Sequence, residues 1–92
     1  MRLFVKLERG IVAKEVFDRF VPAHKEYVLG LNARGRKAST GYWADLGGGM
    51  MLFEAANLED ARAVVALDPL VQNGCVSWEL HEWKIAAGPN LP

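Results

Sequence analysis

The sequence predicts an α+β fold, in which helices pack on one face of a four-stranded antiparallel sheet. Apolar and polar residues alternate over residues 2–8, as in a half-buried strand. Over residues 12–34 the apolar spacing changes to that of an amphipathic helix. Strand-like residues 36–55, a helical segment at 58–67 and a last strand-like stretch follow. The order strand, helix, strand, strand, helix, strand is the ferredoxin-like pattern.

Length and composition fit a single domain spanning residues 1–92, with a loose tail at 86–92. Hydrophobic residues make up 51% of the chain, which suits a packed core. The 11 Lys and Arg residues balance the 11 Asp and Glu residues, so no excess charge favours nucleic acid or an anionic membrane as a partner. No apolar run approaches the roughly 20 residues of a membrane span.

Cysteine usage and the N-terminus favour a cytoplasmic location. Cys75 is the single cysteine and cannot form an internal disulfide, so we interpret it as a small buried apolar residue. Residues 1–6 are too few and too charged to supply the apolar region of a signal peptide.

The first half of the chain predicts a strand and then helix. The strand covers residues 2–8, and Gly10 breaks it. Pro22 lacks an amide hydrogen and disfavours helical geometry in the residue before it. We therefore expect a helical lead-in up to Phe20 and a helix that begins with Pro22 at its first position. Gly35 is expected to end that helix.

The second half predicts a hairpin and a capped helix. Its strands cover residues 36–43 and 50–55. The glycines at 47–49 form the turn between them and not a phosphate cradle, because no helix begins behind them. Asn57 is a good cap for a helix over residues 58–67.

Asp68 and Pro69 end this helix, and a loop through Gly74 leads to the last strand. That strand covers residues 76–85. Its alternation changes parity, which predicts a bulge near residues 81–82.

Two titratable side chains, His24 and Asp68, lie on otherwise apolar helical stripes and are predicted to converge. The two helices of this topology run in opposite directions, so the start of the first and the end of the second lie at one edge of the domain. The turn at 42–49 emerges at the same edge. A buried carboxylate needs a cationic or hydrogen-donating partner, and a histidine exchanges protons near neutral pH. The pair is therefore a candidate for acid–base chemistry.

Other interpretations of these residues remain open. A lone histidine on an apolar stripe is more often a hydrogen-bonded core residue than a catalyst, and the same interpretation makes Asp68 a helix cap or ion-pair partner. A metal site using His24, His81 and a carboxylate is a third hypothesis, although no close ligand spacing supports it. No cofactor motif is present, and the prediction includes neither a cofactor nor a metal.

The chain resembles the YCII-related (YciI-like) family at several short motifs whose order and spacing cover most of its length. The matching features are Pro22-Ala23-His24 with Tyr27 and Leu31, Gly35, Gly41, Leu58-Glu59-Asp60-Ala61, Asp68-Pro69, Gly74 and the terminal strand through Trp83. The chain departs from the family pattern at Tyr42, where many relatives have proline.

The resemblance implies a ferredoxin-like α+β fold, a dimer of the α+β barrel type whose sheets meet face to face, and an active-site pair that matches His24 and Asp68. The YCII group includes dehydrochlorinase-type enzymes. The dimer also follows from the residues, because a sheet face without helices would leave apolar side chains in water. Phe4, with either Met50 and Leu52 or Met51 and Phe53, is expected on that face.

The leading functional hypothesis is a proton-transfer enzyme, a lyase or isomerase acting on a small organic acid or lactone. His24 would act as general base or acid, and Asp68 would fix its tautomer. Ser39, Gly41, Tyr42 and Trp43 are the candidate substrate-binding residues. The alternative is a non-catalytic module for small-ligand binding or oligomerisation.

Overall fold

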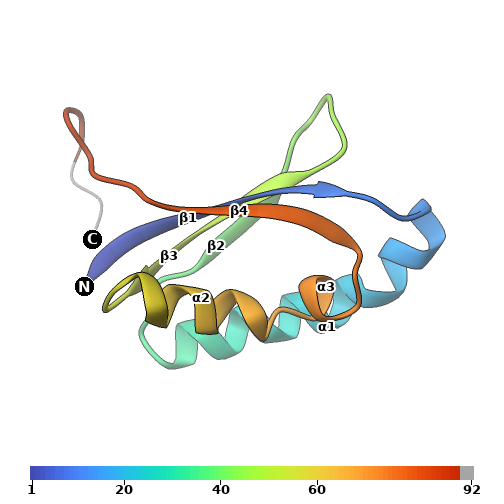
Figure 1. Cartoon of the computed structure of the whole chain (residues 1–92), viewed down its shortest axis with the longest axis horizontal. Helices are drawn as coiled ribbons and strands as arrows, with labels where there is room; N and C mark the ends of the chain where they lie inside the picture. Colours follow the sequence, from blue (N-terminus) through green and yellow to red (C-terminus); the bar gives the residue numbers. More distant parts are fainter. Residues whose placement is uncertain (90–92) are drawn as a thin grey trace.

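A four-stranded sheet of strand order β2-β3-β1-β4 forms one layer of the molecule, and three helices form the other (Figure 1). The computed structural model describes residues 1–89. Each strand is antiparallel to its neighbours, which confirms the predicted ferredoxin-like α+β class. None of the helices in this part of the chain combines the length and hydrophobicity of a membrane span. The elements are β1 (Arg2–Gly10), α1 (Lys14–Ala33), β2 (Ser39–Tyr42), β3 (Gly49–Ala55), α2 (Leu58–Ala66), α3 (Pro69–Gln72) and β4 (Val76–Glu82).

The central strand β1 presents Phe4 and Lys6 to the helices, and both side chains are fully buried. The open face of the sheet carries Leu3, Val5 and Leu7 of this strand, which are half-buried. The prediction that Phe4 faces away from the helices was wrong, because Lys6 shares its parity and has a carboxylate partner on the helix side. The strand also continues through Gly10, which was expected to break it, and pairs there with Val76.

Helix α1 is continuous and contains Pro22 in its interior, where two separate helical segments were predicted. A proline at this position removes one backbone hydrogen bond, the one that the carbonyl of Asp18 would accept. Both residues are exposed, so water can satisfy that carbonyl. The sequence predicted His24 in the first turn of a helix. In the structure it lies in the middle of α1.

The hairpin strands differ at their ends from the predicted ranges 36–43 and 50–55. β2 begins at Ser39, because Lys37 adopts a positive φ of 51° that interrupts extended backbone. β3 begins one residue early, at Gly49. The connection between the strands rises from the side of the sheet that carries no helix (Figure 1).

Asn57 caps α2, as predicted, and its side-chain oxygen accepts a hydrogen bond of 2.8 Å from the amide of Asp60. The expected loop after Asp68 is the short helix α3. Asp68 caps this helix, because its Oδ1 accepts from the amide of Leu70 at 3.0 Å. Asp68 thus meets the start of α3 as well as the end of α2, a contact that the sequence analysis missed.

Strand β4 ends at Glu82, and its register with β1 is uninterrupted from Val76 to that residue, so the predicted bulge near 81–82 is absent. The change of parity at Trp83 has a simpler cause, since the strand has already ended there. Residues 83–89 form no helix or strand and are exposed. The remainder of the predicted loose tail, residues 90–92, lies outside the described residues.

Gly49 gives a test of the hairpin. A Cβ on this residue would collide with the carbonyl oxygen of Gly41 on the neighbouring strand, whereas a Cβ on Gly47 would meet open space. We expect G49A to lower the free energy of unfolding by about 1–3 kcal/mol, the usual cost of overpacking. G47A is the matched control and should stay within about 0.5 kcal/mol of the parent. Urea denaturation measures both, and equal stabilities would contradict the close approach.

Candidate active site

The structure brings His24 and Asp68 together across the interface of α1 with the α2–α3 junction. Nδ1 of the imidazole lies 2.9 Å from Oδ1 of the carboxylate. His24 is 7% exposed and Asp68 is completely buried. The 44 residues that separate them in sequence are bridged by packing of α1 against α3.

Asp68 is surrounded by donors. Besides His24, the amide of Leu70 donates to Oδ1, and Nζ of Lys6 lies 2.6 Å from Oδ2. Burial alone would raise the pKa of the Asp68 carboxyl, but the hydrogen bond to His24 and the charge and hydrogen bond of Lys6 outweigh it. The pKa of Asp68 therefore lies below its ordinary value, and the side chain is an anion at neutral pH.

The ionised Asp68 fixes the tautomer of His24. A carboxylate can only accept hydrogen bonds, so Nδ1 of His24 carries the proton that it shares with Oδ1. In the neutral ring, Nε2 is then the unprotonated nitrogen. It lies 3.0 Å from Oγ1 of Thr40, whose hydroxyl donates to it.

Lys6 holds a second carboxylate beside the pair. Its ammonium group is completely buried and lies 2.6 Å from Oε1 of Glu8 as well as 2.6 Å from Oδ2 of Asp68. Buried ammonium ions are found with such partners because desolvation would otherwise be costly. The site is thus one connected chain of polar groups, in the order Glu8, Lys6, Asp68, His24 and Thr40.

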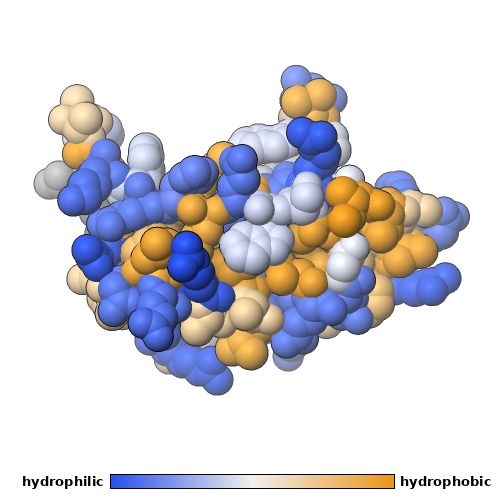
Figure 2. Space-filling view, viewed as in Figure 1, coloured by the Kyte–Doolittle hydropathy of each residue, from blue (hydrophilic) through white to orange (hydrophobic). Residues whose placement is uncertain are grey.

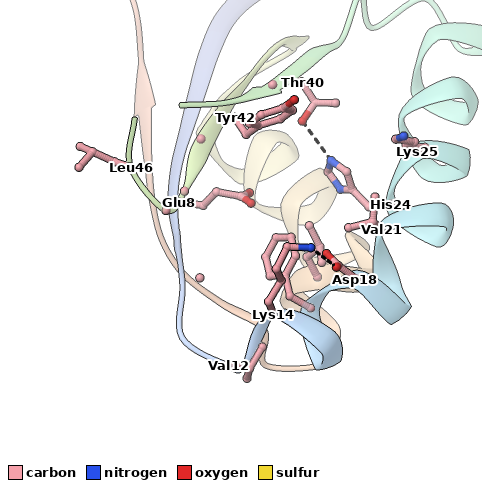
Figure 3. A pocket seen from close by; sticks show the side chains of 17 residues that line it. Glu8, Val12, Lys14, Asp18, Val21, His24, Lys25, Thr40, Tyr42 and Leu46 are labelled. Carbon is pink, nitrogen blue, oxygen red and sulfur yellow. Dashed lines mark hydrogen bonds and ion pairs between the residues drawn. The ribbon is translucent and has the colours of Figure 1, made fainter. Parts of the chain in front are cut away.

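An open cavity of about 760 Å³ adjoins this chain between α1, the first turn of α3 and the base of the β2–β3 hairpin. His24, Thr40 and Glu8 line it, and Figure 3 shows the imidazole turned from α1 toward Thr40. Most of the remaining wall is apolar or aromatic, including Phe17 and Tyr42. A cavity of this size accommodates a small organic molecule.

The four predicted substrate-binding residues lie in different places. Gly41 and Tyr42 line the cavity. Ser39 pairs with Leu52 and lies on the opposite face of the sheet, because residues alternate along β2. Trp43 lines a second hollow at the hairpin and not the cavity beside His24.

Sequence reasoning missed Lys6, Glu8 and Thr40. Thr40 shares its parity with Tyr42, so once β2 is oriented the position follows from alternation. Lys6 and Glu8 share the parity of Phe4, and a lysine in line with a core aromatic residue on a central strand is the signal that was available.

The hypothesis of a metal site that includes His81 does not fit the structure. His81 pairs with Val5 on the open face of the sheet, opposite the face that His24 contacts. Within residues 1–89 no group of three or more His, Cys, Asp or Glu side chains is arranged to hold a metal ion. Cys75 is fully buried, as predicted, and burial and then the nearby Asp68 charge raise the pKa of its thiol.

Comparisons with known proteins agree with this fold. The model of the YCII-related domain matches residues 3–84. The chain is 35% identical over 65 residues to the uncharacterized protein YjpA of Bacillus subtilis (strain 168), an alignment that covers 71% of this chain and 76% of YjpA. It also superimposes with a TM-score of 0.72 on the 5-chloro-2-hydroxyhydroquinone dehydrochlorinase TftG from Burkholderia phenoliruptrix AC1100, solved in complex with 2,5-dihydroxybenzoquinone. That match has 20% sequence identity and covers 89% of this chain and 93% of TftG, so it shows a shared fold.

The depressed pKa of Asp68 predicts a pH-dependent contribution to stability. The ordinary value in the unfolded chain is about 3.9, so the stabilisation is fully present above it and is lost as pH falls through the lower folded-state pKa. We expect D68N to cost about 3 kcal/mol at pH 7, because it removes the anionic partner of a completely buried ion pair. The difference from the parent should shrink at pH 3. Urea unfolding at both pH values measures it.

D18N is the control for this experiment. Asp18 pairs with Lys14 on the exposed face of α1, and such pairs contribute at most about 1 kcal/mol. A destabilisation by D68N that is the same at pH 7 and pH 3 would contradict an ionised Asp68 in the folded protein.

Proposed function

The chain belongs to the YCII-related family, and from the geometry of its site we propose that it is a small proton-transfer enzyme, a lyase or isomerase. One observation carries the proposal. His24 has one ring nitrogen held by a buried anion, and its other nitrogen meets the hydroxyl of Thr40 at the wall of a cavity of suitable size for a small ligand. An imidazole in this arrangement is a competent general base, because the carboxylate stabilises the imidazolium that forms.

In the proposed reaction, Nε2 of His24 takes a proton from a C–H or O–H group of the substrate. The electron pair released from that bond forms a new double bond within the substrate. In a lyase the double bond forms as a leaving group departs with its own electron pair. In an isomerase, Nε2 returns the proton to a different atom of the same molecule. Thr40, whose hydroxyl donates to Nε2, would release this nitrogen and guide the approach of the substrate.

The apolar and aromatic walls favour a ring-shaped substrate over a flexible polar one. TftG, with which the chain shares its fold, is a dehydrochlorinase and binds a quinone, so this fold supports elimination from a ring. By analogy we propose a small cyclic substrate, with the lactones and organic acids of the sequence analysis as candidates.

The general-base role predicts that H24A lowers the rate of turnover by about 10²–10⁴-fold without unfolding the protein. Purified parent and variant are screened against lactones and halogenated ring compounds, with release of protons or halide as the signal. Thermal denaturation of both proteins shows whether the variant is folded.

T40V is a graded control, because it keeps the shape of residue 40 and removes one hydrogen bond to Nε2. It should reduce turnover less than H24A does. Turnover that survives H24A would contradict the proposal. Ligand binding without turnover in the parent would favour the alternative, a small-ligand-binding module.

We also propose that the open face of the sheet is covered by a second copy of the chain. Its half-buried apolar residues come from β1 and from the neighbouring β3 in register: Leu3, Val5, Leu7, Met50 and Leu52. Figure 2 shows that the surface on this side is concave between the β2–β3 hairpin and the segment at 83–89. Two such faces related by a twofold axis would exclude water from these side chains.

A homodimer of this kind predicts that L52E yields a monomer, because the substitution places a charge at the centre of the apolar face. Sedimentation velocity measures the change in mass, and circular dichroism checks the fold. L29E is the matched control, since Leu29 is 65% exposed on α1, on the other side of the molecule. A parent that sediments as a monomer, or a variant that remains dimeric, would contradict this interface.

A further inference from the structure

Glu8 is a carboxylate of the site that the proposed proton transfer does not use. It lies on β1, shares the parity of Lys6 and has a side chain that is 11% exposed. Figure 3 shows its carboxylate extending from the strand into the cavity, on the side opposite His24. It therefore faces any molecule that occupies the cavity.

The charges of the buried trio do not balance. Lys6 carries one formal positive charge, whereas Glu8 and Asp68 carry two formal negative charges. Asp68 has no exposed surface and is hydrogen-bonded by His24, Leu70 and Lys6. Within residues 1–89, Glu8 is paired with Lys6 through Oε1. The uncompensated negative charge thus lies on the cavity side, at Glu8.

Other charged residues of the cavity lie at its rim. Lys14 and Asp18 form an exposed pair at 2.5 Å, and Lys25 is exposed on α1. Charges in contact with solvent are strongly screened, whereas a carboxylate in a partly desolvated pocket is not. The cavity is lined by two acidic and two basic side chains, Glu8, Asp18, Lys14 and Lys25. Its inner part, at Glu8, is nevertheless more negative than the rim.

This arrangement has a direct chemical consequence for ligands. A hydroxyl or amino group that donates to Glu8 forms a charge-assisted hydrogen bond. A ligand carboxylate at the same place meets a like charge at low dielectric. Oγ1 of Thr40, whose hydrogen is donated to Nε2 of His24, is a second acceptor at the cavity wall, and the rings of Phe17 and Tyr42 supply apolar walls.

We propose that Glu8 is a ligand-contacting residue that makes this cavity select neutral, donor-bearing ring molecules over carboxylates. The inference rests on the proposed function in one respect, that the cavity beside His24 is the ligand site. It narrows the candidate substrates from organic acids and lactones to neutral molecules with hydroxyl or amino donors.

The test is a binding measurement that needs no turnover. Isothermal titration with hydroquinone and with benzoate compares a neutral ring bearing two donors with an anionic ring. The parent should bind hydroquinone at least tenfold more tightly. E8Q keeps the size of the side chain and removes its charge, so it should weaken hydroquinone and strengthen benzoate, each by about tenfold. D18N, a rim carboxylate that is also paired with a lysine, should leave the preference unchanged.

An opposite shift of the two ligands supports the proposal, because general damage to the cavity would weaken both. A parent that prefers benzoate or binds neither ring, or a parallel shift in E8Q, overturns it. Should E8Q fail to fold, two other measurements replace it. One compares the same two ligands on E8D, and the other titrates the parent with the monomethyl and dimethyl ethers of hydroquinone. E8D should retain the preference, and each methylation should weaken binding to the parent; the opposite result in either overturns the proposal.

The same measurement on H24A separates this inference from the proposed reaction. H24A should keep a preference that depends on Glu8 even though it loses turnover. Absence of turnover in the parent would refute the enzyme and leave the selectivity intact. Loss of the selectivity with turnover retained would refute the role of Glu8 alone.

Discussion

The buried ion pair of Lys6 and Asp68 is the interaction on which the rest of the structure depends. It joins the central strand of the sheet to the junction of α2 and α3 over 62 residues of sequence, with 2.6 Å between Nζ and Oδ2. Pairs of this kind contribute little net stability, since desolvation offsets the attraction, but loss of one partner is costly. Their value is in fixing position. Here the pair fixes the carboxylate that orients His24, and it also fixes Glu8 beside the cavity.

The proposals assign separate roles to the two ends of this polar chain. Asp68 has no solvent contact and acts on a ligand through His24 alone, whereas Glu8 faces the ligand directly. Lys6 lies between the two carboxylates and pairs with both, which offsets the repulsion between them. Proton transfer and ligand selection can thus be altered independently by substitution at the two ends.

Much of the fold followed from local sequence signals, and the errors have physical causes. Alternation, helical spacing and the Asn57 cap identified the order of the elements, because each depends on neighbouring residues. The convergence of His24 and Asp68 followed from topology. The continuity of α1 through Pro22 could not be predicted in this way. The hydrogen bond lost at proline is evident from the sequence, whereas the packing of the helix on the sheet that compensates for it is not.

Three of the five residues of the polar chain, Glu8, Lys6 and Thr40, were missed because their positions depend on pairing across the sheet. The helix-facing side of β1 is decided by the partner that Lys6 finds, and the strand's own residues favour neither orientation strongly. Ser39 and Trp43 were assigned to the cavity by proximity in sequence, yet alternation along β2 and the turn of the hairpin direct them elsewhere. The face of the sheet on which a side chain lies is decided by pairing partners on other strands, and the residues of a single strand do not reveal it.

Pro22 also has a mechanical consequence. It divides α1 into a first part, residues 14–21, that forms a wall of the cavity, and a second part that carries His24. The turn between them has one backbone hydrogen bond fewer than a regular helix, which lowers its resistance to bending. Bending there would widen or narrow the cavity while the imidazole of His24 stays hydrogen-bonded to Asp68. The polar chain would then keep its geometry while the wall formed by residues 14–21 changed the width of the cavity.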